Sequence, residues 1–309
     1  MSSTTLRTQQ EQGKGVLFGY PISHSLAPYL HQTVFDSLNL SWSFSLLESR
    51  DMAQFLDLLK SPNCYGSAVT MPHKVAILSH LDELTSEGRD CGACNTILIR
   101  KDESGKRTYI GTNTDVVGIR EAFYQNVDRP GEVFQGRPGM VIGGGGAARS
   151  AVYSLRRMMN CKPVYLVNRD KSEVDSVIEE CKSKGFGQNL IHVETLAQAE
   201  KLAAPGAIVS CVPDYPPISK QEHQARNVLE CMLGKKEKGV ILEMCYHPSP
   251  WTEIGNLSEK AGWQVILGTE AMIYQGLEQD MLWTGKQLSE LPVEKVKELI
   301  ATKLAQARL

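Results

Sequence analysis

The sequence predicts an α/β fold in two parts, the second of which is a doubly wound parallel sheet. Two observations carry this prediction. Short apolar segments of strand length recur along the chain, with helical periodicity between most of them. From residue 139 onward, a strand leads directly into a cluster of glycines. Strands that alternate with helices are typical of parallel sheets whose faces are covered by helices.

The first half begins with a polar stretch and then alternates strands and helices. Residues 1–15 are rich in Ser, Thr and Gln, so we expect a disordered tail without a secretory signal. The elements expected next are strands at 16–19 and 68–71 and helices that begin near Pro28 and at Met52. Asp51 is the expected N-cap of the second helix.

The second half contains the strands of the predicted parallel sheet. The expected strands are residues 140–142, 164–167, 207–212, 240–244 and 264–267. After them, residues 270–309 predict two helices with a break near Leu291 and Pro292.

A glycine-rich turn follows the first of these strands. Residues 143–151 read Gly-Gly-Gly-Gly-Ala-Ala-Arg-Ser-Ala and open a helix. Glycines allow a sharp turn and a close approach to a pyrophosphate, and the helix N-terminus offers unpaired N–H groups. We therefore expect a Rossmann-type nucleotide-binding domain that uses Gly143, Gly145, Gly146 and Ala147.

The end of the second strand discriminates between the two nicotinamide cofactors. An acidic residue at this point binds the ribose hydroxyls of NAD, whereas an Arg accommodates the 2′-phosphate of NADP. Here Asn168 and Arg169 follow the strand, with Asp170 and Lys171 after them. The sequence therefore predicts NADP or NAD as cofactor: Arg169 favours NADP, and Asp170 leaves NAD open.

Composition narrows the class of protein further. The chain has 309 residues and a formal net charge of -2, so no overall field attracts nucleic acid or an anionic membrane. No apolar run approaches the roughly 18–20 residues of a membrane span. Eight cysteines without a secretory signal favour reduced thiols. We expect a cytoplasmic enzyme, monomeric or homodimeric, that binds a small molecule.

Three motifs in the first half suggest the chemistry. They are Gly-Tyr-Pro-Ile-Ser-His-Ser-Leu-Ala-Pro at 19–28, Gly-Ser-Ala-Val-Thr-Met-Pro-His-Lys at 66–74, and Gly-Ala-Cys-Asn-Thr at 92–96 with Gly-Thr-Asn-Thr-Asp-Val-Val-Gly at 111–118. Oxidation of a secondary alcohol sends a hydride to nicotinamide and a proton to a base. A lysine can take that proton, and a nearby aspartate can hold the reacting hydroxyl.

Together these motifs closely resemble shikimate and quinate dehydrogenases, and the resemblance spans about residues 16–285. It implies a substrate-binding catalytic domain at 1–118, a Rossmann domain at 119–272, and C-terminal helices at 273–309 that return to the first domain. It also implies that Lys74 and Asp115 are the catalytic pair. The residues that match the family's substrate-binding groups are Ser25, Thr70, Asn95, Tyr246 and Gln275, and Gly268 joins the cofactor site.

The chain departs from the family pattern at three places. Ala27 stands where the family commonly has a second serine, Ala68 where it often has Asn, and residues 208–214 differ from the usual Asn-Ala-Thr-Pro pattern. Ala27 removes a donor to the substrate carboxylate and leaves room for the extra hydroxyl of quinate. We therefore expect the enzyme to interconvert quinate and/or shikimate with the 3-dehydro ketone, with quinate favoured.

Several alternatives remain open at this point. They are a shikimate-specific NADP dehydrogenase, a related enzyme with another substrate such as an amino-substituted ring, and a non-catalytic metabolite sensor. The presence of both Lys74 and Asp115 argues against the sensor, which has no need of such a pair. Cys91 and Cys94 form a CxxC, but no further ligands stand at suitable spacing, so we expect no metal.

Overall fold

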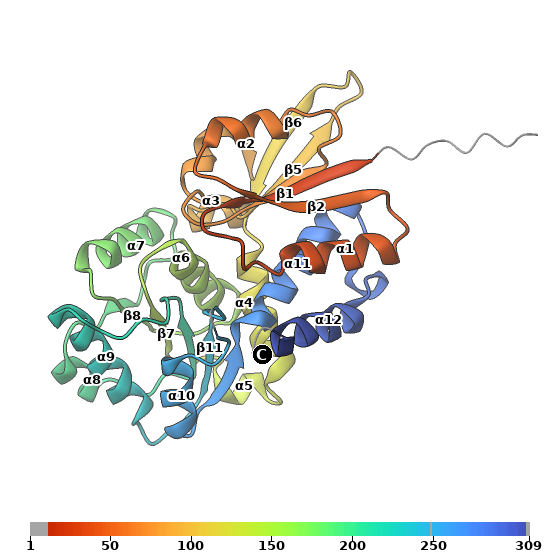
Figure 1. Ribbon diagram of the computed structural model, residues 1–309. Coiled ribbons are helices and arrows are strands. Elements are labelled where there is room, and N and C mark those ends of the chain that lie inside the picture. The colour runs from red at the N-terminus through yellow and green to blue at the C-terminus, as the bar shows by residue number, and fades with distance from the viewer. Residues whose placement is uncertain (1–11, 248, 307–309) are drawn as a thin grey trace, which may run out of the picture.

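The computed structural model describes residues 12–247 and 249–306 (Figure 1). Within these residues it contains two sheets of six strands each, the first within residues 13–112 and the second within residues 139–267. A disordered tail was predicted at residues 1–15, and residues 1–11 of it lie outside the described residues. Residues 13–15 belong to the first strand, which the apolar pattern placed at Val16 because Gly13 and Gly15 offer no apolar side chain.

The first sheet is mixed, with the strand order β2-β1-β3-β5-β6-β4. Its strands are β1 (Gly13–Gly19), β2 (Trp42–Glu48), β3 (Gly66–Val69), β4 (Glu83–Leu84), β5 (Thr96–Lys101) and β6 (Arg107–Thr112). β1 runs parallel to β2 and β3, whereas β5 is antiparallel to β3 and β6. The sequence pattern missed β2 because, of its residues, only Phe44 is fully buried. It missed β5 and β6 because each buries only three successive residues.

Two helices flank this sheet where the sequence predicts them, α1 (Ala27–Ser37) and α2 (Met52–Leu59). A third helix, α3 (Ser86–Cys91), was not predicted. A proline lies in the first turn of α1, where the missing N–H is not needed. The Asp51 carboxylate accepts hydrogen bonds from the backbone N–H groups of Ala53 and Gln54, at 2.9 and 3.3 Å. This confirms Asp51 as the N-cap of α2.

The second sheet is entirely parallel within the described residues, in the order β12-β11-β10-β7-β8-β9. Its strands are β7 (Gly139–Ile142), β8 (Val164–Val167), β9 (Leu190–His192), β10 (Ala207–Ser210), β11 (Val240–Glu243) and β12 (Gln264–Leu267). The central strands are buried along their whole length, as a parallel sheet with both faces covered requires. The strand order reverses between β7 and β10, and ligands of open α/β sheets bind at such a switch point.

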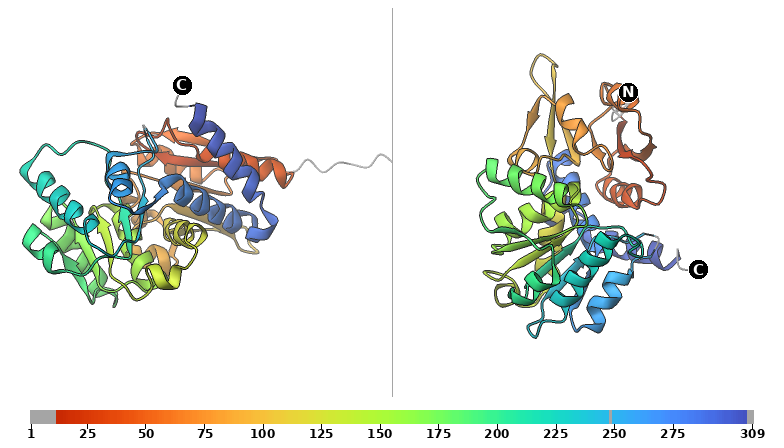
Figure 2. Two further views of the ribbon diagram at one scale, coloured as in Figure 1. Left: turned by 90° about the horizontal axis from the view of Figure 1, so that it is seen from below. Right: turned by 90° about the vertical axis from the view of Figure 1, so that its left-hand side faces the viewer.

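Helices cover both faces of the second sheet (Figures 1 and 2). Those between its strands are α6 (Gly146–Tyr153), α7 (Lys171–Ser183), α8 (Leu196–Lys201), α9 (Lys220–Leu233) and α10 (Glu253–Lys260). The predicted strands match the observed ones, although β10 and β11 end earlier than expected. The mixed α/β architecture and its doubly wound second sheet confirm the predicted fold class.

Two long helices, α4 (Asp115–Asn126) and α11 (Gly268–Thr284), pack against each other between the two sheets. The short α5 (Pro130–Val133) follows α4, and α12 (Val293–Gln306) packs against α1 and α11. The predicted break at Leu291 and Pro292 falls directly before α12. The predicted domain boundaries at residues 118 and 272 lie inside α4 and α11, and we retain that division as a proposal.

Candidate active site

A cavity of about 220 Å³ lies where the carboxyl ends of β1, β3 and β11 meet α4 and α11. Its lining includes all the residues predicted for catalysis and substrate binding, together with Gly268 and Ala27. The predicted residues are Ser25, Thr70, Lys74, Asn95, Asp115, Tyr246 and Gln275. Residues more than 200 positions apart in the chain therefore line one cavity.

Lys74 and Asp115 form an ion pair in this cavity. Lys74 Nζ lies 2.5 Å from Asp115 Oδ2, and the two side chains are 18% and 11% exposed. The backbone carbonyl of Lys74 accepts a hydrogen bond from the N–H of Cys94, at 2.7 Å, which ties the loop after β3 to the segment before β5. Asp115 is the first residue of α4, where the helix dipole favours a carboxylate.

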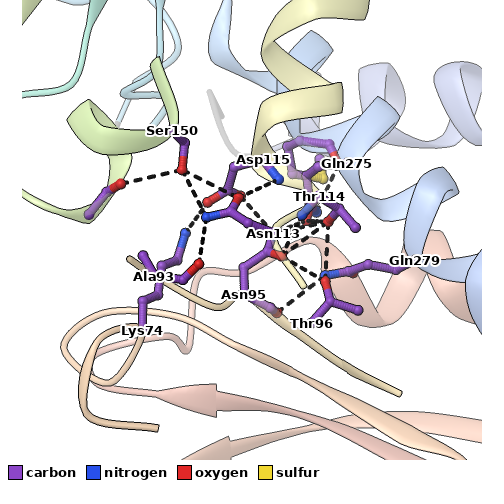
Figure 3. A network of polar contacts seen from close by, with 12 residues as sticks. Lys74, Ala93, Asn95, Thr96, Asn113, Thr114, Asp115, Ser150, Gln275 and Gln279 are labelled. Carbon is purple, nitrogen blue, oxygen red and sulfur yellow. Dashed lines mark hydrogen bonds and ion pairs between the residues drawn. The ribbon is translucent and has the colours of Figure 1, made fainter. Parts of the chain in front are cut away.

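Asn95 holds the second oxygen of Asp115 (Figure 3). Its Nδ2 donates to Asp115 Oδ1 at 2.8 Å and to Thr114 Oγ1 at 3.0 Å, and its Oδ1 accepts from the backbone N–H of Thr114 at 2.8 Å. Asn95 is only 2% exposed. Gln275 accepts from Asn95 Nδ2 at 3.2 Å and so joins the network from α11. Lys74 and Asn95 therefore hold the Asp115 carboxylate from two sides, one at each oxygen.

The opposite end of the cavity is formed by the turn before α1. Ser25 Oγ accepts a hydrogen bond from the backbone N–H of Ala27 at 3.3 Å, so the hydroxyl proton remains available to an acceptor in the cavity. Ala27 is 8% exposed and is the first residue of α1, whose N-terminus favours an anion. Burial raises the pKa of Tyr246 to about 12, so this phenol remains a hydrogen-bond donor near neutral pH.

A second cavity, of about 250 Å³, lies against the glycine-rich turn between β7 and α6. Gly143, Gly145, Asn168 and Arg169 of the predicted cofactor site line it. Gly143 has a φ of 120°, a conformation that side chains rarely adopt, so glycine is needed here. The predicted residues Gly146 and Ala147 start α6 outside this lining.

The glycine-rich turn brings the two cavities together. A Cβ atom added to Gly146 would lie 3.8 Å from Cδ of Lys74, so the start of α6 is beside the lysine of the first cavity. Gly268, predicted for the cofactor site, lines the first cavity instead. Its Cα is packed so closely that an added Cβ atom would overlap the carbonyl oxygen of Met244. Close packing against the end of β11 is therefore a sufficient reason for glycine at 268.

Asp170 does not line either cavity. Its carboxylate caps α7, where it accepts hydrogen bonds from the Ser172 hydroxyl at 2.6 Å and the Ser172 N–H at 2.8 Å. These bonds hold the pKa of Asp170 below its ordinary value. The sequence argument for NAD from Asp170 therefore loses its basis, because the side chain is used to start a helix.

Some residues of the second cavity were missed by sequence reasoning. Glu173, Tyr215, Glu222 and Arg226 also line it. Glu222 carried a detectable signal, since Ser219 and Glu222 have the spacing of a capping box. The other three come from segments without a recognisable pattern, and only the fold brings them to the glycine-rich turn.

Cys91 and Cys94 are free and buried. Burial raises the pKa of both thiols, so neither is a ready thiolate. No group of three or more potential metal-ligating side chains occurs in the part of the chain that the structure describes. Among the same residues, no helix is long and apolar enough to cross a membrane.

Comparison with known proteins identifies the family. Residues 17–97 match the shikimate dehydrogenase substrate binding domain. Quinate dehydrogenase of Emericella nidulans is 44% identical over 99% of this chain and 98% of its own length. The solved dehydroquinate dehydratase and shikimate dehydrogenase from S. pombe AroM has a TM-score of 0.76 and 29% identity, over 93% of this chain and 52% of that one. Shikimate 5-dehydrogenase from Thermus thermophilus has a TM-score of 0.71 and 26% identity, over 92% and 98%.

The fold and the two adjoining cavities define an oxidoreductase with a two-part α/β architecture. The similarity to quinate dehydrogenase over nearly the full chain identifies one family within this class of enzymes. The chain belongs to the shikimate/quinate dehydrogenase family.

Proposed function

We propose that this enzyme interconverts quinate with its 3-dehydro ketone by hydride transfer to a nicotinamide dinucleotide, and that it uses shikimate less efficiently. The observation that carries the proposal is the Lys74–Asp115 pair, which lies inside the first cavity and beside the glycine-rich turn of the second. An acid–base group thus adjoins a nucleotide-binding turn, as alcohol oxidation requires.

The substrate carboxylate binds at the turn before α1. Ser25 offers a hydroxyl there, and the first N–H groups of α1 add partial positive charge. The ring hydroxyls then face Thr70, Asn95 and Gln275 on the other side of the same cavity. This orientation places the alcohol that reacts next to Lys74.

The acid–base work is divided between two side chains. The bound dinucleotide supplies the hydride acceptor, and Lys74 Nζ, as the neutral amine, takes the hydroxyl proton during oxidation; as the ammonium it returns that proton during reduction. Asp115 keeps Nζ in place through Oδ2 and is itself held by Asn95 through Oδ1. The network therefore fixes the lysine before the substrate arrives, which lowers the reorganisation needed in the reaction.

The second cavity takes the adenosine half of the dinucleotide. The glycine-rich turn and the N-terminus of α6 suit a pyrophosphate, and Asn168 and Arg169 follow β8 at the position that usually meets the adenosine ribose. The Thermus thermophilus relative was solved in complex with NADP(H) and shikimate, which supports a nicotinamide cofactor and an alicyclic hydroxy acid for this chain.

The preference for quinate rests on Ala27. Its methyl group lines the cavity next to Ser25, at the end that receives the carboxylate. Quinate carries an extra hydroxyl on the carbon that bears this carboxylate, and a serine hydroxyl at 27 would occupy that space. The Emericella nidulans relative, a quinate dehydrogenase, supports the same substrate.

The test is an absorbance assay for reduced nicotinamide with the purified full-length chain. Quinate and shikimate are each combined with NAD and with NADP, and we expect the higher kcat/KM for quinate. If both acids bind in calorimetry but neither is oxidised with either cofactor, the chain is a metabolite sensor and the proposal is wrong. If shikimate alone is oxidised, the preference for quinate is wrong.

A further inference from the structure

Four arginine and glutamate side chains line the second cavity, which we call the dinucleotide cavity: Arg169, Glu173, Glu222 and Arg226. Two are cations and two are carboxylates, so their charges sum to zero. Arg169 Nη1 forms an ion pair with Glu222 Oε1. Glu173 accepts a hydrogen bond from Asn168 Nδ2 at 2.6 Å. The arginine that would favour a 2′-phosphate is therefore already paired with a carboxylate from α9.

The Glu222 carboxylate is held in this position by its own helix. Its Oε2 accepts hydrogen bonds from the backbone N–H groups of Ile218 and Ser219, at 2.9 and 2.8 Å. The Ser219 hydroxyl in turn accepts from the N–H of Glu222 at 3.2 Å, which completes a capping box. Bonds from the Ser219 and Ile218 N–H groups, followed by Arg169, lower the pKa of Glu222 to about 2. Glu222 is therefore ionised at any physiological pH.

We propose that Glu222 is a specificity-determining residue for the cofactor and that, by pairing with Arg169, it directs the enzyme to NAD rather than NADP. This inference rests on the proposed binding of a nicotinamide dinucleotide in the cavity of the glycine-rich turn. Arg169 by itself would favour NADP, but its pairing with Glu222 opposes that preference.

The physical reason is electrostatic repulsion between the 2′-phosphate of NADP and the Glu222 carboxylate, whose position is held by hydrogen bonds. A 2′-phosphate carries about -1.5 to -2 charges at neutral pH. To reach Arg169 it must share the guanidinium with Glu222 or displace a carboxylate that two backbone N–H groups also hold. The 2′-hydroxyl of NAD brings no charge and can donate a hydrogen bond to a carboxylate. Glu173 is a second carboxylate on the same lining, and the other cation there, Arg226, is already paired with Glu253 at 3.1 Å.

The test compares cofactor binding by the wild-type enzyme and a Glu222→Gln variant. Glutamine is accepted at this position of a capping box, so α9 keeps its N-terminus while the charge is lost. We expect wild type to bind NAD more tightly than NADP. In the variant we expect the affinity for NADP to rise roughly tenfold relative to NAD, equivalent to about 1.4 kcal/mol. Isothermal titration calorimetry reports this without any turnover.

A pair of fragments isolates the 2′-phosphate. 5′-AMP and 2′,5′-ADP differ only in that group, so the gain in Glu222→Gln should appear for 2′,5′-ADP and be absent for 5′-AMP. The double variant Arg169→Ala/Glu222→Gln should lose the gain, because the released arginine is then missing. An equal gain in the double variant would overturn the role of the Arg169 pairing.

Glu194→Gln is the matched control. Glu194 pairs with Lys171, at 3.1 Å, and lines neither cavity. The same loss of charge there should leave cofactor selectivity unchanged. The inference is wrong if Glu222→Gln changes the affinities for NAD and NADP equally, or if Glu194→Gln gives the same gain. If wild type binds neither dinucleotide, the proposed function fails, and this inference with it.

Discussion

The cavities proposed for the substrate and for the dinucleotide hold their charged groups in different ways. In the proposed substrate cavity, both oxygens of Asp115 have partners, Lys74 and Asn95, and Asn95 is 2% exposed. In the proposed dinucleotide cavity, Arg169 lies in the loop after β8, has a 64% exposed side chain and pairs with Glu222 of α9. Buried, fully partnered groups are rigid and costly to disturb, whereas exposed pairs contribute little to stability and are screened by salt. The first arrangement suits chemistry, and the second suits selection between ligands.

The largest effect should follow from the loss of Lys74. Lys74→Ala removes the proposed proton acceptor, so kcat should fall by about 10²-fold or more, the usual scale of acid–base catalysis. KM for quinate should change less, because the carboxylate and the other hydroxyls keep their partners. Steady-state kinetics at saturating cofactor measure both constants.

The control for this variant is Lys60→Ala. Lys60 forms an exposed ion pair with Asp57 on α2, at 3.0 Å, so its removal should leave kcat unchanged. If the Lys74→Ala enzyme kept near wild-type turnover, Lys74 would not be the proton acceptor, and its role in the wild type would be limited to the ion pair with Asp115.

A buried carboxyl at the end of β11 contrasts with Asp115. Glu243 is 1% exposed; its Oε1 accepts from the Cys245 N–H at 3.1 Å, but its Oε2 has no hydrogen-bond partner among the described residues. Burial raises the pKa of Glu243 to about 7. The unfolded chain releases this proton near its ordinary pKa, while the folded chain keeps it. The contribution of Glu243 to the free energy of unfolding is therefore fully present below the pKa of the unfolded chain and is lost as pH rises through about 7.

Glu243→Gln should remove this dependence. At low pH the variant and wild type should differ least; between roughly pH 4.5 and 7 the variant should gain up to about 3 kcal/mol relative to wild type. Urea unfolding midpoints at several pH values measure the difference. The control is Glu290→Gln, because the pKa of Glu290 is lowered and its side chain is exposed. A constant difference between Glu243→Gln and wild type across this range would show that Glu243 is ionised in the folded enzyme.

Asn95→Ala tests the rigidity of the substrate cavity. The variant leaves the buried N–H of Thr114 without its acceptor and Asp115 Oδ1 without its donor. We expect a loss of about 1–3 kcal/mol in the free energy of unfolding and a lower kcat/KM for quinate. Asn126→Ala, at the end of α4, removes an amide that bonds the Ala122 carbonyl and should change both quantities much less. An Asn95→Ala enzyme of unchanged stability would mean that the Asn95 hydrogen bonds do not stabilise this cavity.

Much of the fold could be predicted from the sequence because the second sheet is buried along its central strands. Uninterrupted apolar runs followed by glycines leave little choice of structure there. The first sheet was predicted less completely, because β2 buries only Phe44. Local patterns reveal a strand only where its burial is continuous or strictly alternating.

The candidate site shows the same limit. The residues predicted from contiguous motifs line the substrate cavity, because each motif is one short segment next to a strand or helix end. Arg169 was judged in isolation, and its partner Glu222 lies on α9, 53 residues away. A pairing between side chains of different elements has no local pattern, so only the structure reveals it.

The smallest expected effect is a change in selectivity between quinate and shikimate when Ala27, in the proposed substrate cavity, is replaced by serine. Ala27→Ser adds one hydroxyl at the first residue of α1, where it lines the cavity beside Ser25. The new donor should improve the hydrogen bonding of the shikimate carboxylate by about 0.5–1.5 kcal/mol. The same oxygen fills space that the extra hydroxyl of quinate uses, so kcat/KM for quinate should fall.

Both changes move selectivity toward shikimate, but neither is large. A pocket rejects an added hydroxyl only weakly unless the two groups clash, so we expect a ratio of kcat/KM values that changes by roughly two- to tenfold. Serine is well tolerated near a helix N-terminus, so stability should be unaffected. Ala68→Ser, at the end of β3 in the same cavity, is the matched control, since it adds a hydroxyl away from the Ser25 turn. If Ala27→Ser leaves the ratio unchanged, or Ala68→Ser changes it as much, the cavity does not select quinate through the space at residue 27.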